Sequence, residues 1–471
     1  MKNTICNSYS SLRRKVVTLF ISSLPIVSFA QGIVGAWKGV LNVGQSQLNI
    51  VFHINSNNTI TMDSPDQGAM GIPTMVKYLA ADSLCIEMEA MKVVYSGKLV
   101  GDEINGTFSQ MGYSFPLNLK KGEVKLNRPQ TPQPPFPYQT KEVSFENKGT
   151  DLKTGKPSAA GSALLAGTLT LPEGFKKGMP VVLMVNGSGQ QNRDEELMGH
   201  KPFCVIADWL ARNGIATLRY DDRGVGQSTG DAAKATTYDN MLDALAGIDF
   251  LKKTKEFGKI GVLGHSEGGT IGYMLAANGK ADFVVSLAGP TLRGDSILLM
   301  QNRDILKKAG LDDENINKYA EALHRIFQYK ASGKKFRFAS TPEVLLPMLT
   351  SDISLPEQLR ANLLETMKQL DSVWLNYFIS YDPANDLRQT KCPVMLLGGS
   401  YDTQVRAKEN ISTAKSLLPK NSKSLFKEYP NVNHLFQPST NGMPLEYGKI
   451  ETTIKEEVLK DIAAWIKSVV K

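Results

Sequence analysis

Hydrophobic and polar residues follow two different patterns in the two parts of this chain. In the first part, apolar and polar residues alternate in short stretches broken by Gly, Asn and Asp, as in LNIVFHI at 48–54. A period of two is typical of strands that are buried on one face. Several such stretches in a row predict a small antiparallel β domain, either a barrel or a sandwich, over residues 31–128.

The second pattern begins after a proline-rich stretch. The run QTPQPPFP at 130–137 has few backbone donors and holds an extended backbone, so it predicts a linker at 129–140. Beyond it, apolar runs such as VVLMV (181–185) and VMLLGG (394–399) alternate with stretches of helical spacing. This alternation predicts an α/β domain over 141–471, with a mainly parallel sheet and helices on both faces.

One long interval interrupts the alternation. Between Gly289 and Pro393 the chain is richer in charged residues and helix formers, and no buried strand is evident. A structureless loop of this length inside a compact domain is improbable. We therefore expect a helical insertion over about 291–390 that covers the sheet edge as a lid.

The N-terminal thirty residues have the features of a secretory signal peptide. They contain four basic residues and no acidic one, an apolar run at 16–27 and the small-residue end Ser28-Phe29-Ala30. An apolar run of about a dozen residues is too short to span about 30 Å of hydrocarbon, which disfavours a retained anchor. We expect cleavage before Gln31, export to the periplasm or the medium, and no stable membrane anchor afterwards.

Composition and charge narrow the function classes. The chain has 471 residues, of which 42% are hydrophobic and 21% charged, so it is expected to fold around conventional cores. Its formal charge is +8, but cleavage of the leader would remove four basic residues and halve that excess. No nucleic-acid partner is predicted. The sequence also lacks a phosphate-binding loop and Cys/His metal spacing, and we expect neither cofactor nor metal.

The strongest chemical signal is the run GHSEGG at 264–269. It follows the apolar run IGVLG and precedes a stretch of helical character. A G-x-S-x-G between strand and helix forms a tight turn that exposes the serine oxygen, and its glycines relieve crowding there. Ser266 is therefore the predicted nucleophile, while the side chain of the neighbouring His265 is expected to point elsewhere.

A serine nucleophile needs a base, and the base needs an acid that orients it. His434 is the predicted base because it follows a strand-like run and precedes the last predicted helix. Asp402 is the predicted acid because it stands after the run VMLLGG, where the carboxyl end of a strand would place it at the site. Asp382 and Asp386 remain weaker candidates for the acid.

Acyl transfer also needs hydrogen-bond donors for the oxyanion of the tetrahedral intermediate. The run NGSG at 186–189 follows the strand VVLMV, and its glycines would let backbone N–H groups approach a substrate oxygen. We expect the N–H groups of Ser188 and Glu267 to form the hole, with Gly189 as the alternative to Ser188. Candidate substrate-loop residues are Gly187, Gly189 and Arg193.

Together these residues resemble the α/β-hydrolase superfamily. The segment RYDDRGVGQS (219–228) resembles its post-strand R-x-D-x-R-G-x-G-x-S pattern, and NGSGQQNRDE (186–195) is similar to the HGSG-x-x-x-RDE loop of bacterial secreted serine esterases. Asn186 stands where that subgroup usually has His. The resemblance covers about 141–471. It implies a carboxylic ester hydrolase that acts on small-molecule esters through an acyl-enzyme and without a cofactor.

Two other functions stay open. A serine aminopeptidase of the same fold would need acidic side chains to hold a free amine, and Asp194, Glu195 and Glu196 beside the predicted oxyanion loop could supply them. A non-catalytic periplasmic binding protein would use the β domain to capture its ligand. For that β domain, plain structural support is the simplest expectation.

Overall fold

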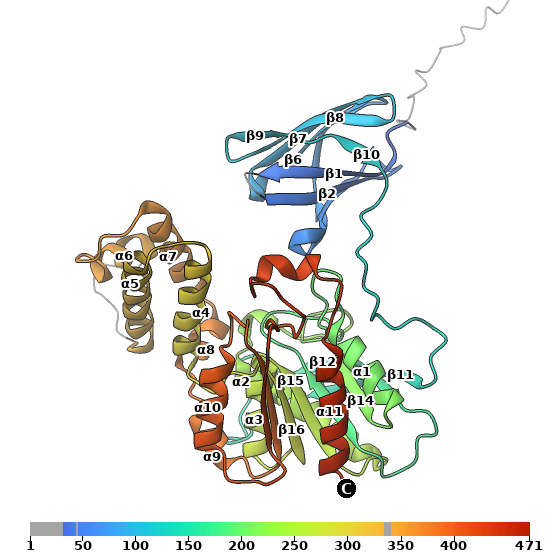
Figure 1. The fold of residues 1–471 in the computed structure, drawn as a ribbon, viewed down its shortest axis with the longest axis vertical. Coiled ribbons are helices and arrows are strands. Elements are labelled where there is room, and N and C mark those ends of the chain that lie inside the picture. Colours follow the sequence, from blue (N-terminus) through green and yellow to red (C-terminus); the bar gives the residue numbers. More distant parts are fainter. Residues whose placement is uncertain (1–31, 44–45, 334–340) are drawn as a thin grey trace, which may run out of the picture. The chain divides into compact units, whose positions relative to one another are not determined.

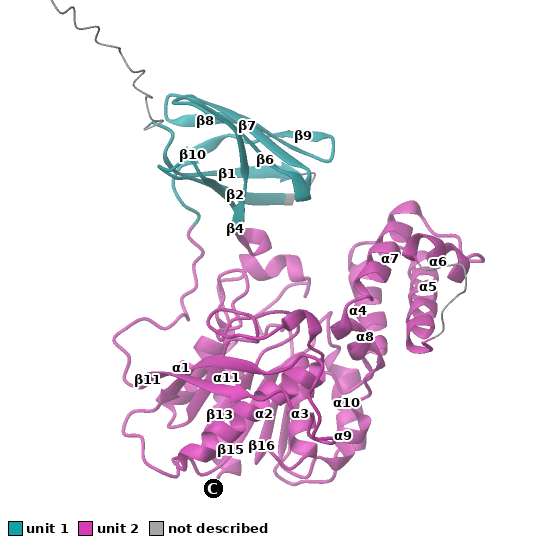
Figure 2. Cartoon of the chain, turned by 180° about the vertical axis from the view of Figure 1, so that it is seen from behind, with its two compact units in different colours: residues 1–63, 71–124 teal, residues 64–70, 125–471 magenta. Residues whose placement is uncertain are grey.

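The computed structural model describes residues 32–43, 46–333 and 341–471 (Figure 1). These residues form two compact units (Figure 2): unit 1 contains the chain up to Asp63 and Gly71–Val124, and unit 2 contains Ser64–Met70 and Lys125–Lys471. The predicted signal peptide at 1–30 lies outside the described residues. Within those residues, no helix is long and apolar enough to cross a membrane.

The first sheet is antiparallel and has the strand order β4-β3-β2-β1-β10-β8-β7-β6-β5, with β9 paired to β8. Its elements are β1 (Gly35–Val43), β2 (Ser46–Ile54), β3 (Ile60–Ser64), η1 (Pro65–Gln67), β4 (Ala69–Pro73), β5 (Met75–Leu79), β6 (Ser83–Met88), η2 (Glu89–Met91), β7 (Val93–Val100), β8 (Glu103–Gln110), β9 (Tyr113–Pro116) and β10 (Leu119–Lys121).

One core lies inside this sheet. The rings of Phe52 and Tyr95 stack at a centroid distance of 4.8 Å, and the Tyr95 hydroxyl donates to a backbone carbonyl at 3.1 Å. The indole N–H of the buried Trp37 donates to the Ile33 carbonyl at 2.7 Å, so the polar edges of these rings are satisfied. A single sheet around a single core is barrel-like, which confirms the predicted antiparallel domain.

The second sheet has the strand order β11-β12-β14-β13-β15-β16-β17-β18. β12 is antiparallel to both β11 and β14, and the pairs from β14 to β18 are parallel. The strands are β11 (Gln139–Asn147), β12 (Ala163–Leu171), β13 (Val181–Val185), β14 (Ala216–Tyr220), β15 (Ile260–His265), β16 (Phe283–Leu287), β17 (Val394–Gly399) and β18 (Leu425–Tyr429).

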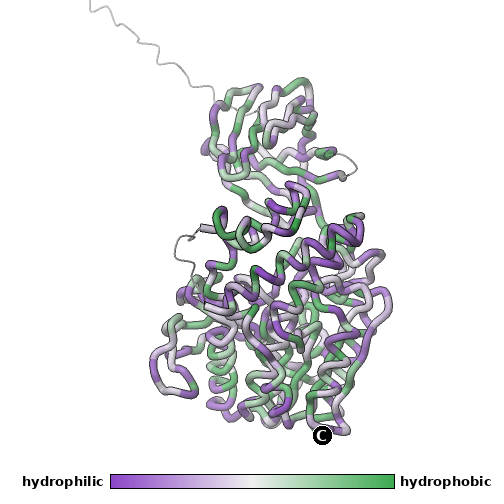
Figure 3. The backbone as a smooth tube through the Cα atoms, turned by 90° about the vertical axis from the view of Figure 1, so that its left-hand side faces the viewer, coloured by the Kyte–Doolittle hydropathy of each residue, from purple (hydrophilic) through white to green (hydrophobic). Residues whose placement is uncertain are grey.

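Helices cover both faces of this sheet (Figure 1), which confirms the predicted α/β-hydrolase fold. Side chains alternate along β13: Val182 and Met184 join the core under α1 and α11, while Leu183 joins the core under α2 and α3. Figure 3 shows the resulting hydrophobic stretches within unit 2. The covering helices are α1 (Pro202–Arg212), α2 (Thr237–Thr254), α3 (Glu267–Ala277), α10 (Ala407–Leu417) and α11 (Glu456–Val469), and the short helices η3 (Ala232–Lys234) and η4 (Pro444–Lys449) lie in the connections.

The interval between β16 and β17 is helical, as its composition predicts. It contains α4 (Gly294–Lys308), α5 (Asp313–Ala331), α6 (Pro342–Leu349), α7 (Glu357–Gln369) and α8 (Val373–Ser380), followed by α9 (Ala384–Gln389). Helices α5 to α8 share a core of their own, whereas Leu387 of α9 belongs to a core of the main sheet. The insertion thus returns to the main body of unit 2 at α9, slightly before the expected end near 390.

The predicted linker and Arg128, the residue before it, pack against the rest of unit 2. The Arg128 guanidinium donates to the carbonyls of Met198 and Gly448 at 2.8 and 2.7 Å, and the Gln130 amide donates to the Ile454 carbonyl at 2.8 Å. Unit 2 therefore includes the chain from Lys125 onward, before the expected boundary at 128, and β11 begins inside the expected linker 129–140. Side-chain hydrogen bonds to distant carbonyls cause this difference, and proline content does not indicate them.

A buried ion pair between Arg223 and Asp243 provides a test of unit 2 stability. Two guanidinium nitrogens donate to Asp243 at 2.7 Å each, Asn147 donates to it at 2.6 Å, and both charged side chains are almost fully buried. Asp243→Ala would leave the guanidinium buried and unpaired, and we expect a loss of about 3–5 kcal/mol in the free energy of unfolding, measured by urea titration. Lys460→Ala, which breaks the exposed pair with Glu456, should cost less than about 1 kcal/mol. Equal losses of unfolding free energy in the two variants would contradict the prediction that the buried pair matters more.

Candidate active site

Ser266 occupies the turn between β15 and α3. Its backbone has φ 50° and ψ −121°, a conformation that L-residues rarely adopt, and its N–H donates to the Leu287 carbonyl at 2.8 Å. A Cβ at Gly264 would lie 2.0 Å from the Gly268 carbonyl oxygen, and one at Gly268 would lie 2.1 Å from the Val185 carbonyl oxygen. Both positions therefore require glycine, and the predicted nucleophile stands on the strained turn that its motif implies.

His434 and Asp402 meet at the carboxyl ends of β18 and β17. His434 Nδ1 lies 2.7 Å from Asp402 Oδ2, and both side chains are almost fully buried. The other carboxylate oxygen, Oδ1, accepts the backbone N–H groups of Gln404 and Val405 at 2.8 Å each. The carboxylate is thus held in place, assigns the proton to Nδ1, and leaves Nε2 of His434 able to act as a base.

The two rival acids lie in local contacts of another kind. An oxygen of Asp386 accepts the hydroxyl of Tyr381, and Asp382 accepts the backbone N–H of Ala384 at 2.9 Å. Neither contacts His434 in the described structure, so the geometry favours Asp402 as the partner of the histidine.

The NGSG loop runs alongside the nucleophile. A Cβ built on Gly187 would lie 3.3 Å from the Cβ of Ser266, which shows how closely this backbone approaches the elbow. The Gly187 N–H is already used, because it donates to Glu195 Oε1 at 2.8 Å. No described residue accepts a hydrogen bond from the N–H groups of Ser188, Gly189 or Glu267. These three remain the candidate oxyanion donors, and both predicted alternatives stay open.

Glu195 and His265 form a junction that sequence reasoning missed. Glu195 Oε1 also contacts His265 Nδ1 at 2.8 Å, and His265 Nε2 contacts the backbone carbonyl of His434 at 3.0 Å. Burial alone would lower the pKa of His265, but the Glu195 carboxylate outweighs it, and the pKa is raised. Both partners, a carboxylate oxygen and a carbonyl oxygen, are acceptors, so the geometry has the imidazole donate from both nitrogens. The side chain expected to point elsewhere joins the elbow to the chain that carries His434.

Arg193, a predicted substrate-loop residue, is committed to structural contacts. Its guanidinium donates to both carboxylate oxygens of Asp221, at 3.1 and 2.7 Å, and to the hydroxyl of Thr168 at 2.8 Å. It also forms an ion pair with Glu142. These contacts tie the loop to β12 and to the end of β14, and they leave the guanidinium little freedom to bind substrate.

The insertion reaches the elbow through Trp374 of α8. The indole N–H of Trp374 lies 2.9 and 3.0 Å from the two carboxylate oxygens of Glu267, the residue after the nucleophile. The Glu267 side chain is buried, and burial raises its pKa although hydrogen bonds from Trp374 and Ser188 favour the charged form. One carboxylate therefore links the elbow, the oxyanion loop and the insertion.

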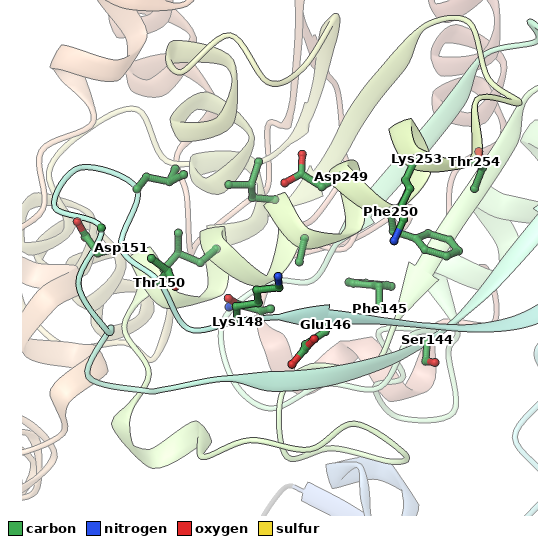
Figure 4. Close-up of a pocket in the computed structure, with 16 residues that line it drawn as sticks. Ser144, Phe145, Glu146, Lys148, Thr150, Asp151, Asp249, Phe250, Lys253 and Thr254 are labelled. Carbon is green, nitrogen blue, oxygen red and sulfur yellow. The ribbon is translucent and has the colours of Figure 1, made fainter.

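A separate cleft of about 1030 Å³ lies between β11 and α2 (Figure 4). Its labelled lining includes Phe145 and Lys148 from the strand side and Asp249, Phe250 and Lys253 from the helix. None of the described residues that line it belongs to the predicted site. The predicted site of Ser266 lies elsewhere, at the carboxyl ends of the central strands of this sheet.

Comparisons with known proteins find one matching family and two relatives. The model of the X-Pro dipeptidyl-peptidase (S15) family matches residues 161–427, more than half of the chain. Esterase EstD of Thermotoga maritima is 26% identical over 306 residues, which cover 64% of this chain and 65% of the relative, so the chain spans just under two thirds of that relative's length. An uncharacterised 31.7 kDa protein of Escherichia coli is 21% identical over 274 residues, covering 56% of this chain and 86% of the relative.

Solved structures with a similar chain path include two esterases. The Pyrococcus furiosus esterase Pf2001 shares 17% identity at a TM-score of 0.40, covering 74% of this chain and 100% of the other. Est1E from Butyrivibrio proteoclasticus, solved with ferulic acid bound, shares 16% identity at a TM-score of 0.39, covering 65% of this chain and 96% of the other.

The buried charge at Glu267 leads to a testable pH dependence. Because burial raises the pKa of this carboxyl above its ordinary value of 4.5, the folded state loses stability as the pH rises from that value through the raised pKa. Glu267→Gln keeps an oxygen for the Trp374 indole and removes the charge. The free energy of unfolding of the variant minus that of wild type should therefore be larger at about pH 8 than at about pH 5. The increase should be about 1.4 kcal/mol for each unit by which folding raises the pKa of Glu267.

Urea titrations followed by circular dichroism at both pH values measure this gain. Ser416→Ala is the control, since that exposed side chain lies in the same unit and carries no titratable group. Its difference from wild type should not change with pH. A pH-independent difference for Glu267→Gln as well would contradict the prediction.

Proposed function

The chain belongs to the X-Pro dipeptidyl-peptidase (S15) family, and from this premise we propose that it is a serine hydrolase that cleaves small carboxylic esters through an acyl-enzyme. The observation that carries the proposal is the Asp402–His434 hydrogen bond of 2.7 Å at the strand ends, in the same unit as Ser266 on its strained turn. A buried, oriented imidazole and a half-buried serine on an elbow are the parts that acyl transfer needs.

Acylation follows from these groups. His434 Nε2 takes the hydroxyl proton as Ser266 Oγ attacks the ester carbonyl carbon, and Asp402 stabilises the imidazolium that forms. The carbonyl oxygen becomes an oxyanion that the N–H of Glu267 and the N–H of Ser188 or Gly189 stabilise. Collapse of the intermediate breaks the bond to the alcohol oxygen, which receives the proton from His434.

Deacylation repeats the sequence with water. His434 removes a proton from a water molecule, the resulting hydroxide attacks the acyl carbon, and the bond to Ser266 Oγ breaks. The proton returns to the serine oxygen and the carboxylic acid departs. No cofactor or metal takes part in these steps.

A peptidase of the same fold is the second candidate, and the description of the matched family favours it. The acids first considered for binding a free amine have other partners: Asp194 pairs with Arg219, Glu195 accepts Gly187 and His265, and Glu196 contacts Lys201 at 3.5 Å. We therefore rank the esterase first. Faster turnover of aminoacyl p-nitroanilides than of p-nitrophenyl acetate would reverse that order.

We also propose that the protein is exported, which rests on the basic and apolar pattern of residues 1–30. Protein recovered from the periplasm or medium of expressing cells should begin at Gln31 by N-terminal sequencing. A full-length N-terminus in that fraction would overturn the cleavage. A binding protein without catalysis is disfavoured by the oriented Asp402–His434 pair, which a binding function does not require.

Replacing the nucleophile and the acid tests the mechanism. Ser266→Ala should abolish fluorophosphonate labelling and lower kcat for p-nitrophenyl acetate by about 10⁶-fold, since the covalent step is lost. Asp402→Asn should lower kcat by about 10⁴-fold, because an amide in that position no longer favours the required tautomer of His434.

Two control variants distinguish these effects from general damage. Ser416→Ala changes an exposed serine of α10 and should leave labelling and kcat at the wild-type level. Asp386→Asn alters the rival acid and should leave kcat nearly unchanged. A loss in Asp386→Asn as large as that in Asp402→Asn would mean that the acid has been misassigned.

A further inference from the structure

A second cavity, of about 190 Å³, opens at the carboxyl ends of β13 and β14. Gly189 of the oxyanion loop borders it on one side and Trp374 of the insertion on the other. Gly187 packs against Ser266, and two residues of chain span at most about 7 Å, so Gly189 lies within about 10 Å of the nucleophile. Trp374 is hydrogen-bonded to Glu267, the residue that follows the nucleophile. The cavity is therefore within reach of a group attached to Ser266.

The position of the cavity assigns it to the acyl side of the substrate. The leaving alcohol has to depart beside His434, which protonates it, and His434 lies next to His265, the residue before the nucleophile. The cavity is instead lined by Gly189, one of the candidate oxyanion donors, and by Trp374, the hydrogen-bond partner of Glu267. No described residue that lines it comes from the segment around His434. An acyl group held at Ser266 with its oxygen in the oxyanion hole can extend into this space.

The size of the cavity limits what it can hold. A cavity of about 150 Å³ suffices for benzene, whereas sites for drug-sized ligands have about 300–1,000 Å³. A volume of about 190 Å³ thus fits one ring or a branched chain of similar size. The indole of Trp374 and the methyl groups of Ala232 and Ala235 provide an apolar wall for such a group.

Of the four polar side chains that line the cavity, Gln190, Asp222, Arg223 and Asn240, those of Asp222 and Asn240 favour a hydrogen-bond donor on that group. Asp222 accepts hydrogen bonds from neutral donors, the Asn186 amide at 3.0 Å and the Gln191 backbone N–H at 2.9 Å, and it forms no ion pair among the described residues. Burial raises its pKa well above the ordinary value, as expected for a carboxylate without a cationic partner. Asn240 of α2 lines the same cavity, and in the described structure its side-chain amide makes no hydrogen bond.

We propose that this cavity is the acyl subsite and that it selects a compact, ring-sized acyl group bearing a hydroxyl or amino donor, which Asp222 and Asn240 bind. This inference rests on the proposed ester hydrolysis at Ser266. It goes further by naming the substrate class. Long acyl chains do not fit. An unsubstituted ring leaves the Asn240 amide without a partner and adds no donor to the two that Asp222 already accepts.

Matched p-nitrophenyl esters test the selection. The set contains the benzoate, its hydroxy and aminomethyl derivatives at the meta and para positions, and the decanoate. Each kcat/KM is divided by the ester's rate of alkaline hydrolysis, which removes its intrinsic reactivity. We expect at least one donor-bearing benzoate to exceed benzoate by about tenfold, the effect of one additional hydrogen bond, and decanoate to be poorer than benzoate.

Variants of Asn240 and Asp222 test whether these two side chains cause the preference for donor-bearing esters. Asn240→Ala removes an amide that makes no hydrogen bond in the described structure, and it should lower the ratio of donor-bearing benzoate to benzoate at least about threefold. Asp222→Asn should lower this ratio most for the aminomethyl esters. Asp249→Asn, the same change on the distant α2 surface, should keep the wild-type ratio. Because the readout is a ratio, a general loss of activity in Asp222→Asn does not obscure it.

The outcomes separate this inference from the function on which it rests. Wild-type protein without fluorophosphonate labelling or p-nitrophenyl acetate hydrolysis would overturn the esterase itself. Normal labelling with equal rates for all benzoates, or a preference unchanged in both Asn240→Ala and Asp222→Asn, would overturn the subsite alone. Decanoate turned over as fast as benzoate would overturn the size limit.

Discussion

The carboxylate of Glu195 is the contact on which the geometry of the site depends. A single oxygen accepts the Gly187 N–H and the His265 imidazole, each at 2.8 Å, and that imidazole in turn donates to the His434 carbonyl at 3.0 Å. The NGSG loop, the residue before Ser266 and the segment that carries His434 are therefore held by one buried group. A charged hydrogen-bond network of this kind is stronger in a buried site than in water, and it fixes the relative positions that acyl transfer requires.

Close backbone packing around the elbow complements this network. A Cβ at Gly268 would be 2.1 Å from the Val185 carbonyl oxygen, and one at Gly269 would be 2.5 Å from the Ser286 hydroxyl. The first turn of α3 is thus pressed against the ends of β13 and β16. The strained conformation of Ser266 persists because the surrounding strands leave no room for relaxation. Backbone contact and the Glu195 network therefore hold the elbow around Ser266 from both sides of the residue, α3 after it and His265 before it.

The sequence predicts those parts of the site that follow from local patterns. Ser266 is identified by its position between a buried strand and a helix, and Asp402 and His434 by their places after later strands; each needs only the order of elements along the chain. The contacts from Glu195 to His265 and from Trp374 to Glu267 join residues 70 and 107 positions apart, and no local period encodes them. Arg193 shows the converse. Its place in the loop suggested a role toward substrate, but its side chain is bound by Asp221, 28 positions away.

The insertion is part of the site because of what Glu267 requires. A buried carboxylate is costly unless donors replace its water, and here the Trp374 indole of α8 is one of those donors. The main sheet alone does not supply that N–H. Any displacement of α8 would therefore remove a donor from a charge one residue from the nucleophile, and would at the same time move a wall of the 190 Å³ cavity. The proposed selection of the acyl group and the electrostatics of the elbow therefore depend on the same side chain, Trp374.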